Sequence, residues 1–286
     1  MEPNSSAATL ILSCPDQKGL VARISQFFFL RGGNIVDLDE HVDKEEKMFF
    51  IRLELDLKDS VITGTDFENE FQRLVDEFHG TWEIKYSSNK SRVAIFVSKM
   101  DHCLQEILWR NSNEELNADI VMIVSNHTDL EFLSERYGIP FYHFPVDKEN
   151  KVKIEHDEIK LLEDNHIDTI VLARYMQILS PDFVKRYPNK IINIHHSFLP
   201  AFIGADPYKK AFQRGVKLIG ATSHYVTEEL DEGPIIEQDV IRITHKDSLK
   251  DLIRKGRDLE RLVLARALDY HLNNRVLKFG KKTIIF

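Results

Sequence analysis

The sequence predicts an α/β protein with two domains, and three patterns support this. The N-terminal part follows the order strand, helix, strand, strand, helix, strand, which is the ferredoxin-like βαββαβ pattern. From Arg92 onward strands alternate with helices, which predicts a Rossmann-like, mostly parallel sheet with helices on both faces. The polar stretch Tyr86–Ser91 separates the two patterns. We therefore expect domains over residues 1–86 and 87–286.

Turn and cap residues bound the elements of the first domain. Asp16 can cap the first helix, Gly32 and Gly33 end it, and the charged run Asp43–Glu46 forms the turn between two strands. The predicted strands are Thr9–Ser13, Asn34–Val42, Lys47–Leu57 and Thr81–Lys85, and the predicted helices are Gly19–Leu30 and Asp66–Phe78.

Short apolar runs mark the strands of the second domain, and longer amphipathic stretches mark its helices. A long amphipathic pattern near the C-terminus predicts one extended helix, and a glycine at position 280 predicts a final hairpin. The predicted strands are Val93–Val97, Asp119–Val124, Thr169–Leu172 and Lys190–His195; helices are expected near His102–Trp109, Asp129–Tyr137, Asp157–Asp164, Pro181–Arg186 and Lys246–Asn273, and the hairpin over Arg275–Phe286.

Composition excludes several classes of protein. The net charge is −8 and the pI is about 5.9, and no block of basic residues stands out to neutralise phosphates, so we expect no nucleic-acid partner. The N-terminus has no secretory pattern, and no segment approaches the apolar length of a membrane span, which predicts a cytoplasmic protein without a membrane partner. The two cysteines, Cys14 and Cys103, suggest neither a disulfide framework nor a metal site.

The most informative stretch is Asn193–Pro200, together with Asp231 further along the chain. Along the predicted strand Ile191–His195, Asn193 and His195 point to one face, near the carboxyl edge where open α/β sheets bind ligands. An amide and a protonated imidazole can both donate to a developing oxyanion, and a carboxylate can accept a proton, which is the equipment for acyl-type transfer. The alternative is that Asn193 and His195 close a buried hydrogen-bond network and Asp231 caps a turn.

The surrounding residues resemble a known family. The runs Asn193–Pro200 and Gly220–Pro234 closely resemble the folate-dependent formyltransferases, which carry the formyl group on 10-formyltetrahydrofolate. The resemblance implies a catalytic trio of Asn193, His195 and Asp231. It also implies folate binding by the segment that begins at Met176, where Gln177 replaces the arginine of some members, and by the loop before Asp231; the implied folate-binding residues are Gln177, Ile178, Leu179, His224, Thr227 and Glu228.

The formyl acceptor is suggested by the loop Ser98–His102. Members that formylate a purine-precursor ribonucleotide carry a glycine-rich phosphate loop there, whereas this loop has no glycine and contains Asp101, which opposes an anion. The resemblance is therefore to members whose acceptor is water. It implies hydrolysis of 10-formyltetrahydrofolate to formate and tetrahydrofolate, which supplies formate for one-carbon and purine metabolism, with no other cofactor and no metal. The alternatives are transfer to a small acceptor, or a non-catalytic folate or amino-acid sensor.

The first domain resembles an ACT domain through Cys14–Val21 and Arg31–Ile35. That resemblance implies an amino-acid effector and a homo-oligomer, either a dimer or a tetramer. The alternative is that the cap residue and the glycines serve only the local helix.

Overall fold

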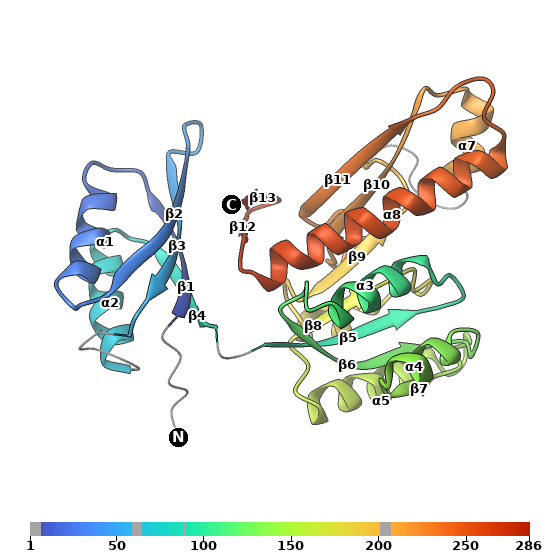
Figure 1. The fold of residues 1–286 in the computed structure, drawn as a ribbon, viewed down its shortest axis with the longest axis horizontal. Helices are drawn as coiled ribbons and strands as arrows, with labels where there is room; N and C mark the ends of the chain where they lie inside the picture. Colours follow the sequence, from blue (N-terminus) through green and yellow to red (C-terminus); the bar gives the residue numbers. More distant parts are fainter. Residues whose placement is uncertain (1–6, 59–64, 88–89, 201–206) are drawn as a thin grey trace. The chain divides into compact units, whose positions relative to one another are not determined.

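The computed structural model describes residues 7–58, 65–87, 90–200 and 207–286 and contains two compact units, Met1–Lys90 and Ser91–Ile285 (Figure 1). Each unit contains its own sheet and its own buried apolar core. The division falls after Lys90, four residues beyond the end of the first predicted domain (90 − 86 = 4). None of the helices in the described ranges has the length and apolar character that a membrane span requires.

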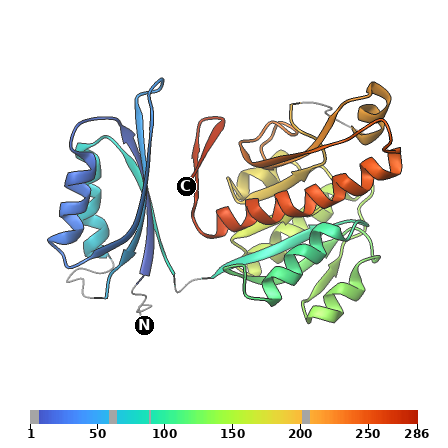
Figure 2. The same ribbon diagram turned by 45° about the horizontal axis from the view of Figure 1, so that its top comes forward.

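The first unit is the predicted ferredoxin-like fold. Its four strands form an antiparallel sheet in the order β2-β3-β1-β4, and α1 and α2 cover one face of this sheet (Figure 2). Every second residue of β1 is buried, as a strand with one covered face requires. The elements are β1 (Ala7–Pro15), α1 (Leu20–Phe29), β2 (Asn34–Asp43), β3 (Met48–Asp56), α2 (Thr65–Glu77) and β4 (Thr81–Tyr86).

The second unit is built on a seven-stranded sheet in the order β11-β10-β9-β8-β5-β6-β7. The strands from β9 to β7 are parallel, which confirms the predicted mostly parallel sheet, and β10 and β11 add an antiparallel edge. The strands are β5 (Ser91–Val97), β6 (Ala118–Ser125), β7 (Phe141–His143), β8 (Thr169–Leu172), β9 (Ile191–His195), β10 (Leu218–Tyr225) and β11 (Ile235–Arg242), followed by the hairpin β12 (Val276–Phe279) and β13 (Lys282–Ile285).

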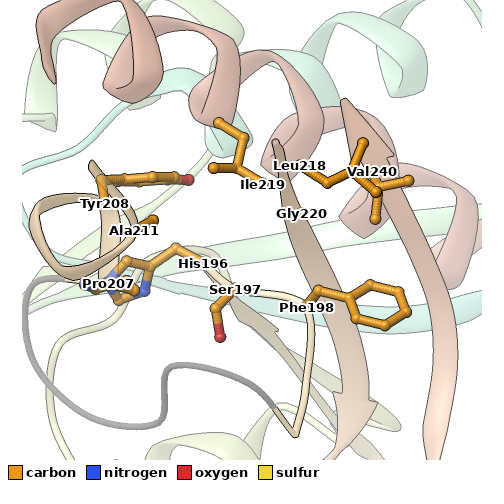
Figure 3. A pocket seen from close by; sticks show the side chains of 10 residues that line it. All are labelled: His196, Ser197, Phe198, Pro207, Tyr208, Ala211, Leu218, Ile219, Gly220 and Val240. Carbon is orange, nitrogen blue, oxygen red and sulfur yellow. The ribbon is translucent and has the colours of Figure 1, made fainter. Parts of the chain in front are cut away.

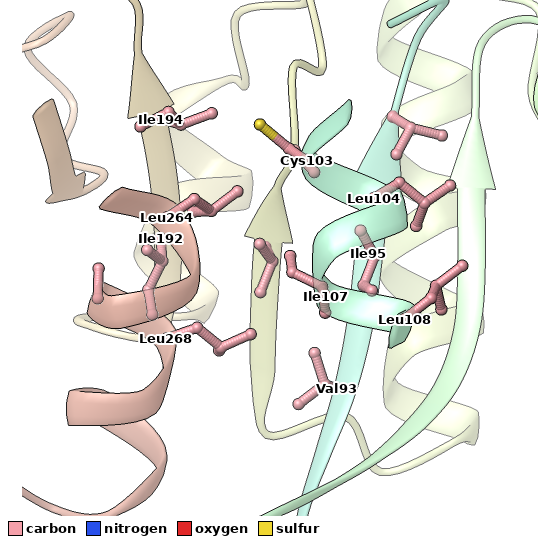
Figure 4. Packing of buried hydrophobic residues seen from close by; sticks show 14 of the residues in the cluster. Val93, Ile95, Cys103, Leu104, Ile107, Leu108, Ile192, Ile194, Leu264 and Leu268 are labelled. Carbon is pink, nitrogen blue, oxygen red and sulfur yellow. The ribbon is translucent and has the colours of Figure 1, made fainter. Parts of the chain in front are cut away.

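Helices cover both faces of this sheet. On one face α3 and α8 pack against Val93, Ile95, Ile192 and Ile194 (Figure 4), and on the other α5 and α6 pack against the alternate residues of the same strands. The helix α8 starts at a capping box in which Ser248 and Asp251 satisfy each other's backbone N–H groups. The helices are α3 (His102–Ser112), α4 (Glu131–Tyr137), α5 (Lys151–Asp164), α6 (Pro181–Arg186), α7 (Pro207–Arg214) and α8 (Leu249–Leu272).

Four elements of this unit were not predicted from the sequence: β7, α7, β10 and β11. The strand β10 is buried at seven of its eight positions and so shows no alternation of apolar and polar residues, the signal on which strand prediction depends. The strand β7 has only three residues, which is too short for a periodic signal. The helix α5 also begins at Lys151, six residues before its predicted start at Asp157 (157 − 151 = 6).

Candidate active site

The predicted catalytic residues meet at the carboxyl end of β9. Ile192 and Ile194 point into the core under α3 and α8, so Asn193 and His195 point to the other face of the sheet. The neighbouring strand β10 pairs in register with β9 and places His224 opposite Asn193. The segment after β9 leaves the sheet as a bend, and the loop after β10 carries Asp231 to the same place.

Asp231 joins two histidines. Its Oδ2 lies 3.2 Å from Nδ1 of His195, and its Oδ1 lies 3.6 Å from Nε2 of His224. The other ring nitrogen of His195, Nε2, is buried and has no hydrogen-bond partner within the described residues. The carboxylate therefore fixes the orientation of the His195 ring and leaves Nε2 available to a substrate.

The protonation state of Asp231 follows from these neighbours. Burial raises the pKa of Asp231, but hydrogen bonds from His195 and His224 and the positive charge of these rings outweigh burial and hold the pKa well below its usual range. Asp231 is therefore ionised at neutral pH and can stabilise a protonated His195.

Asn193 and His224 form a second contact within the site, next to the pair of His195 and Asp231. Nδ1 of His224 lies 3.0 Å from the carbonyl oxygen of Tyr225, and its Nε2 lies 3.2 Å from Nδ2 of Asn193. We infer that Nδ1 donates to the carbonyl, which leaves Nε2 between the Asn193 amide and Asp231. The amide has a second N–H, which is left for an oxyanion next to His195.

Gly233 holds the Asp231 loop against β10. A Cβ atom at position 233 would lie 1.7 Å from the carbonyl oxygen of Tyr225, so only glycine allows this approach. On the same side the Tyr225 N–H donates to the carbonyl of Pro234 at 2.9 Å. Asp231 itself has a φ of 58°, in the left-handed region that aspartate tolerates better than most residues.

The predicted folate segment is a loop between β8 and α6. Ile178 is exposed, Gln177 and Leu179 are half-buried, and Leu179 packs against the core under α5 and α6, the same face to which Asn193 and His195 point. Three backbone groups of this segment are already bonded: the Met176 N–H donates to the Ser98 hydroxyl at 3.1 Å, Lys151 donates to the Ile178 carbonyl at 2.5 Å, and the Ser180 N–H donates to Glu155. The segment therefore has a fixed backbone next to the catalytic edge.

The remaining predicted folate residues lie in the loop after β10. Thr227 donates its hydroxyl to the carbonyl of Glu229 at 3.1 Å, and Glu228 is exposed and pairs with Lys185 at 3.5 Å. His224 is instead 2% exposed and bonded to the catalytic residues, which indicates a positioning role.

A second buried polar cluster lies on the other side of the end of β9, and sequence reasoning missed it. Its centre is Glu260 of α8, whose side chain is 1% exposed. Nε2 of His102 lies 2.8 Å from Oε2 of this carboxylate, the Tyr208 hydroxyl donates to Oε1 at 2.5 Å, and Nε of Arg174 lies 3.5 Å from Oε2. The cluster joins the first residue of α3, the end of β8, the first turn of α7 and the middle of α8. The sequence signal that could have revealed this cluster is Glu260 itself, a charged residue within the apolar stripe of α8.

Arg174 has an unusual backbone. Its φ is 65°, and a side chain other than that of glycine costs roughly 1–2 kcal/mol in the left-handed region. The preceding residue, Ala173, points into the core under α3 and α8, and the left-handed turn directs Arg174 to that same side, toward Glu260. Nε and Nη1 of Arg174 and Nδ1 of His102 are buried without a hydrogen-bond partner in the described part of the chain.

The donor atoms of His102, Cys103 and Glu260 lie within 4.8 Å of one another, a spacing that could suit a metal ion. The surrounding chemistry favours a hydrogen-bond network instead. Burial, followed by the nearby Glu260 charge, raises the pKa of the Cys103 thiol well above its usual range. The Arg174 guanidinium also places a positive charge next to the same carboxylate.

An apolar cavity of about 320 Å³ lies beside the residues that follow His195 (Figure 3). Its walls come from His196–Phe198, the start of α7 and the strands β10 and β11, and Tyr208 and His196 form its polar side. Burial, followed by the Arg174 charge, lowers the pKa of His196 to about 4, so this ring is neutral. The cavity does not include Gln177–Leu179 or Thr227 and is distinct from the predicted folate segment.

The fold and the site together define a class of protein, a formyl-transfer domain joined to an ACT domain. Residues 91–268 match the formyl transferase family, and residues 8–61 match the ACT domain. A formyltetrahydrofolate deformylase from Synechocystis sp. is 50% identical over 279 residues, which cover 98% of each chain. The chain belongs to the formyltetrahydrofolate deformylase family.

Solved structures agree with this assignment. The crystal structure of a formyltetrahydrofolate deformylase from Pseudomonas syringae pv. tomato is 45% identical with a TM-score of 0.95, and the match covers 98% of this chain and 94% of that one. A glycinamide ribonucleotide transformylase from Symbiobacterium toebii is 28% identical with a TM-score of 0.64, and this match covers 68% of the present chain and 94% of the other.

Proposed function

We propose that this protein hydrolyses 10-formyltetrahydrofolate to formate and tetrahydrofolate. The observation that carries the proposal is the pairing of His195 with Asp231, which leaves Nε2 of His195 unpartnered within the described residues, at the edge of the sheet where ligands bind. The name of the Synechocystis relative supports the same substrate and reaction. The formate would serve one-carbon and purine metabolism.

In the proposed mechanism, the protonated His195 and the amide of Asn193 donate to the formyl oxygen. A water molecule attacks the formyl carbon, so that a new C–O bond forms and the carbonyl becomes a tetrahedral oxyanion. Asp231, held ionised by its neighbours, accepts a proton from this water. The proton passes to N10 as the C–N10 bond breaks, and the formic acid that results ionises to formate. Each step uses protein side chains and the folate, so we propose that no further cofactor takes part.

The folate is proposed to lie on the same side of β9 as this trio. There the backbone of Gln177–Leu179 and the loop with Thr227 and Glu228 would contact its pterin, whose amide-like edge pairs well with main-chain groups. Through its contacts with both side chains, His224 would hold Asn193 and Asp231 in place. We also propose a cytoplasmic location.

Labelled substrate separates hydrolysis from transfer. When 10-formyltetrahydrofolate labelled in the formyl carbon is incubated with the enzyme and saturating glycinamide ribonucleotide, we expect the label in formate, at a rate that does not depend on the ribonucleotide. The reason is that the loop Ser98–Asp101 has no glycine to cradle a phosphate. Substantial label in the ribonucleotide would replace hydrolysis with formyl transfer.

For the first unit we propose an amino-acid effector and a role in assembly. Because the proposed catalytic residues all lie beyond Ser91, deletion of residues 1–90 is expected to change assembly or amino-acid response more than chemistry. Light scattering and titration calorimetry with each amino acid, on the full chain and the deletion, measure both. An unchanged assembly, together with an unchanged response to every amino acid, would contradict this role.

A further inference from the structure

We propose that Lys151 and Glu155 of α5 are positioning residues for the folate, because they hold the backbone of residues 176–180 in the shape that receives the pterin. These residues are called the folate loop below. The inference rests on the proposed function and names the side chains that set the affinity of the site for folate. Both residues lie outside the catalytic trio, on a helix that packs against the same face of the sheet as the folate loop.

Lys151 and Glu155 bond directly to the backbone of the folate loop. Nζ of Lys151 donates to the carbonyl oxygen of Ile178 at 2.5 Å, and Oε1 of Glu155 accepts from the Ser180 N–H at 3.0 Å. The same Glu155 oxygen lies 3.9 Å from the Lys151 ammonium, so each charge helps to orient the other. Hydrogen bonds to charged groups are the stronger ones. The two contacts therefore fix the backbone on both sides of Leu179.

A third polar side chain continues the same row on α5. Glu158 follows Lys151 and Glu155 at the spacing i, i+4 and i+7, which places all three on one face of the helix. It accepts from the Tyr175 hydroxyl at 3.2 Å, directly before the folate loop, and both side chains are buried. Burial raises the pKa of Glu158 to about 7, so its charge is costly in this place. A buried row of carboxylates that apolar residues could replace is typical of a functional region rather than of a helix that only packs.

The other end of the folate loop is held from the centre of the sheet. The hydroxyl of Ser98, at the end of β5, donates to Oδ1 of Asn126 at 2.7 Å and accepts from the Met176 N–H at 3.1 Å. Between the two held ends, the backbone of Gln177 and Leu179 makes no hydrogen bond to any part of the chain that the structure describes. Its donors and acceptors are therefore left for the amide-like edge of the pterin.

A loop that already has its binding shape loses little conformational freedom when the ligand arrives, and this raises affinity. If one contact is removed, the loop can move and part of the binding free energy is spent on ordering it. The catalytic trio is carried by β9 and by the loop after β10, so the chemical step does not depend on these contacts. Loss of either positioning residue should therefore appear in folate affinity and KM rather than in kcat.

Lys151→Met is the first test, because the Lys151 side chain is 37% exposed and its replacement should leave the fold intact. We expect the Kd for tetrahydrofolate, measured by titration calorimetry on the full chain, to rise about tenfold. At saturating 10-formyltetrahydrofolate, kcat should stay within about threefold of the wild type, so that the loss falls on KM. Lys153→Met is the matched control on an exposed position of the same helix, and it should bind tetrahydrofolate as the wild type does.

Glu155→Leu separates a positioning role from a purely structural one. Leucine fills similar space but accepts no hydrogen bond, so the Kd should rise about tenfold or more. Glu155→Gln keeps an accepting oxygen for the Ser180 N–H and should recover most of this affinity. Because both residues hold one loop, the double variant Lys151→Met with Glu155→Leu should lose less affinity than the product of the two single losses.

Unchanged affinity in Lys151→Met, or a Glu155→Gln variant that binds no better than Glu155→Leu, would each overturn the proposal. Urea unfolding checks the variants, and if Glu155→Leu does not fold, the affinity of Lys151→Met decides. A wild type that binds tetrahydrofolate but releases no formate would end the proposed function, while the same titrations still test the two positioning residues. A wild type that binds no tetrahydrofolate would overturn both.

Discussion

Asp231→Asn is expected to lower kcat by about 10²- to 10⁴-fold, the usual worth of a positioned acid-base group. Asparagine keeps the size of the side chain but removes the charge that stabilises protonated His195 and the oxygen that accepts a proton. The affinity for folate is expected to stay within a few-fold, because the pterin contacts proposed above are backbone groups of other residues. Steady-state kinetics together with direct binding of tetrahydrofolate separate the two effects.

The acidic side of the pH profile provides a further check on Asp231. Its pKa is lowered in the folded protein, so the carboxylate stays ionised as the pH falls through the range where an ordinary aspartate is protonated. Its contribution to stability is present above the unfolded pKa and is lost only as the pH falls through the lowered folded pKa. The wild type should therefore lose no activity through Asp231 between pH 5 and neutrality.

Asp239→Asn is the matched control for this substitution. Asp239 lies on β11 and forms a half-exposed pair with Arg266 at 3.1 Å, so the same chemical change there should leave kcat within about twofold. Near-normal turnover of Asp231→Asn, or an equal loss in both variants, would remove Asp231 from the mechanism.

Gly233→Ala is expected to lower kcat/KM by about 100-fold and to destabilise the protein by roughly 2–4 kcal/mol. The new methyl group would lie 1.7 Å from the carbonyl oxygen of Tyr225, so the loop must move away from β10 and take Asp231 with it. A displacement of about 1 Å at a catalytic group is enough for such a loss of activity. Kinetics and urea unfolding measure the two effects.

Gly33→Ala tests whether any glycine replacement has this effect. A Cβ at position 33 would meet its neighbours at 3.4 Å or more, which is ordinary contact, so its activity should match that of the wild type. If Gly233→Ala is as active as Gly33→Ala, the loop does not depend on this close approach.

Elements whose signals are local could be predicted from the amino-acid sequence. Alternating apolar residues and glycines predicted the six elements of the first unit and the parallel strands β5, β6, β8 and β9. The predicted cap of the first helix was wrong: α1 begins after Gly19, which has no side chain to form a cap hydrogen bond, and Asp16 lies three residues earlier. The alternation along Ile191–His195 also placed Asn193 and His195 on one face, because side-chain direction in a strand depends only on sequence position. The resemblance of Asn193–Pro200 and Gly220–Pro234 to formyltransferases predicted the family, and the comparisons confirmed it.

How residues far apart in the sequence come together became visible in the folded structure. The strand β10, which places His224 against Asn193, is buried throughout most of its length and so gave no strand signal. The Glu260 cluster brings together residues from α3, α8, α7 and the end of β8, and the left-handed φ of Arg174 turns its side chain toward Glu260. The sequence around Glu260 does not show that it pairs with Arg174, and the sequence around Arg174 does not show that it pairs with Glu260. Burial makes each charge costly unless a partner is supplied, and which partner lies within reach depends on the packing of elements far apart in the chain.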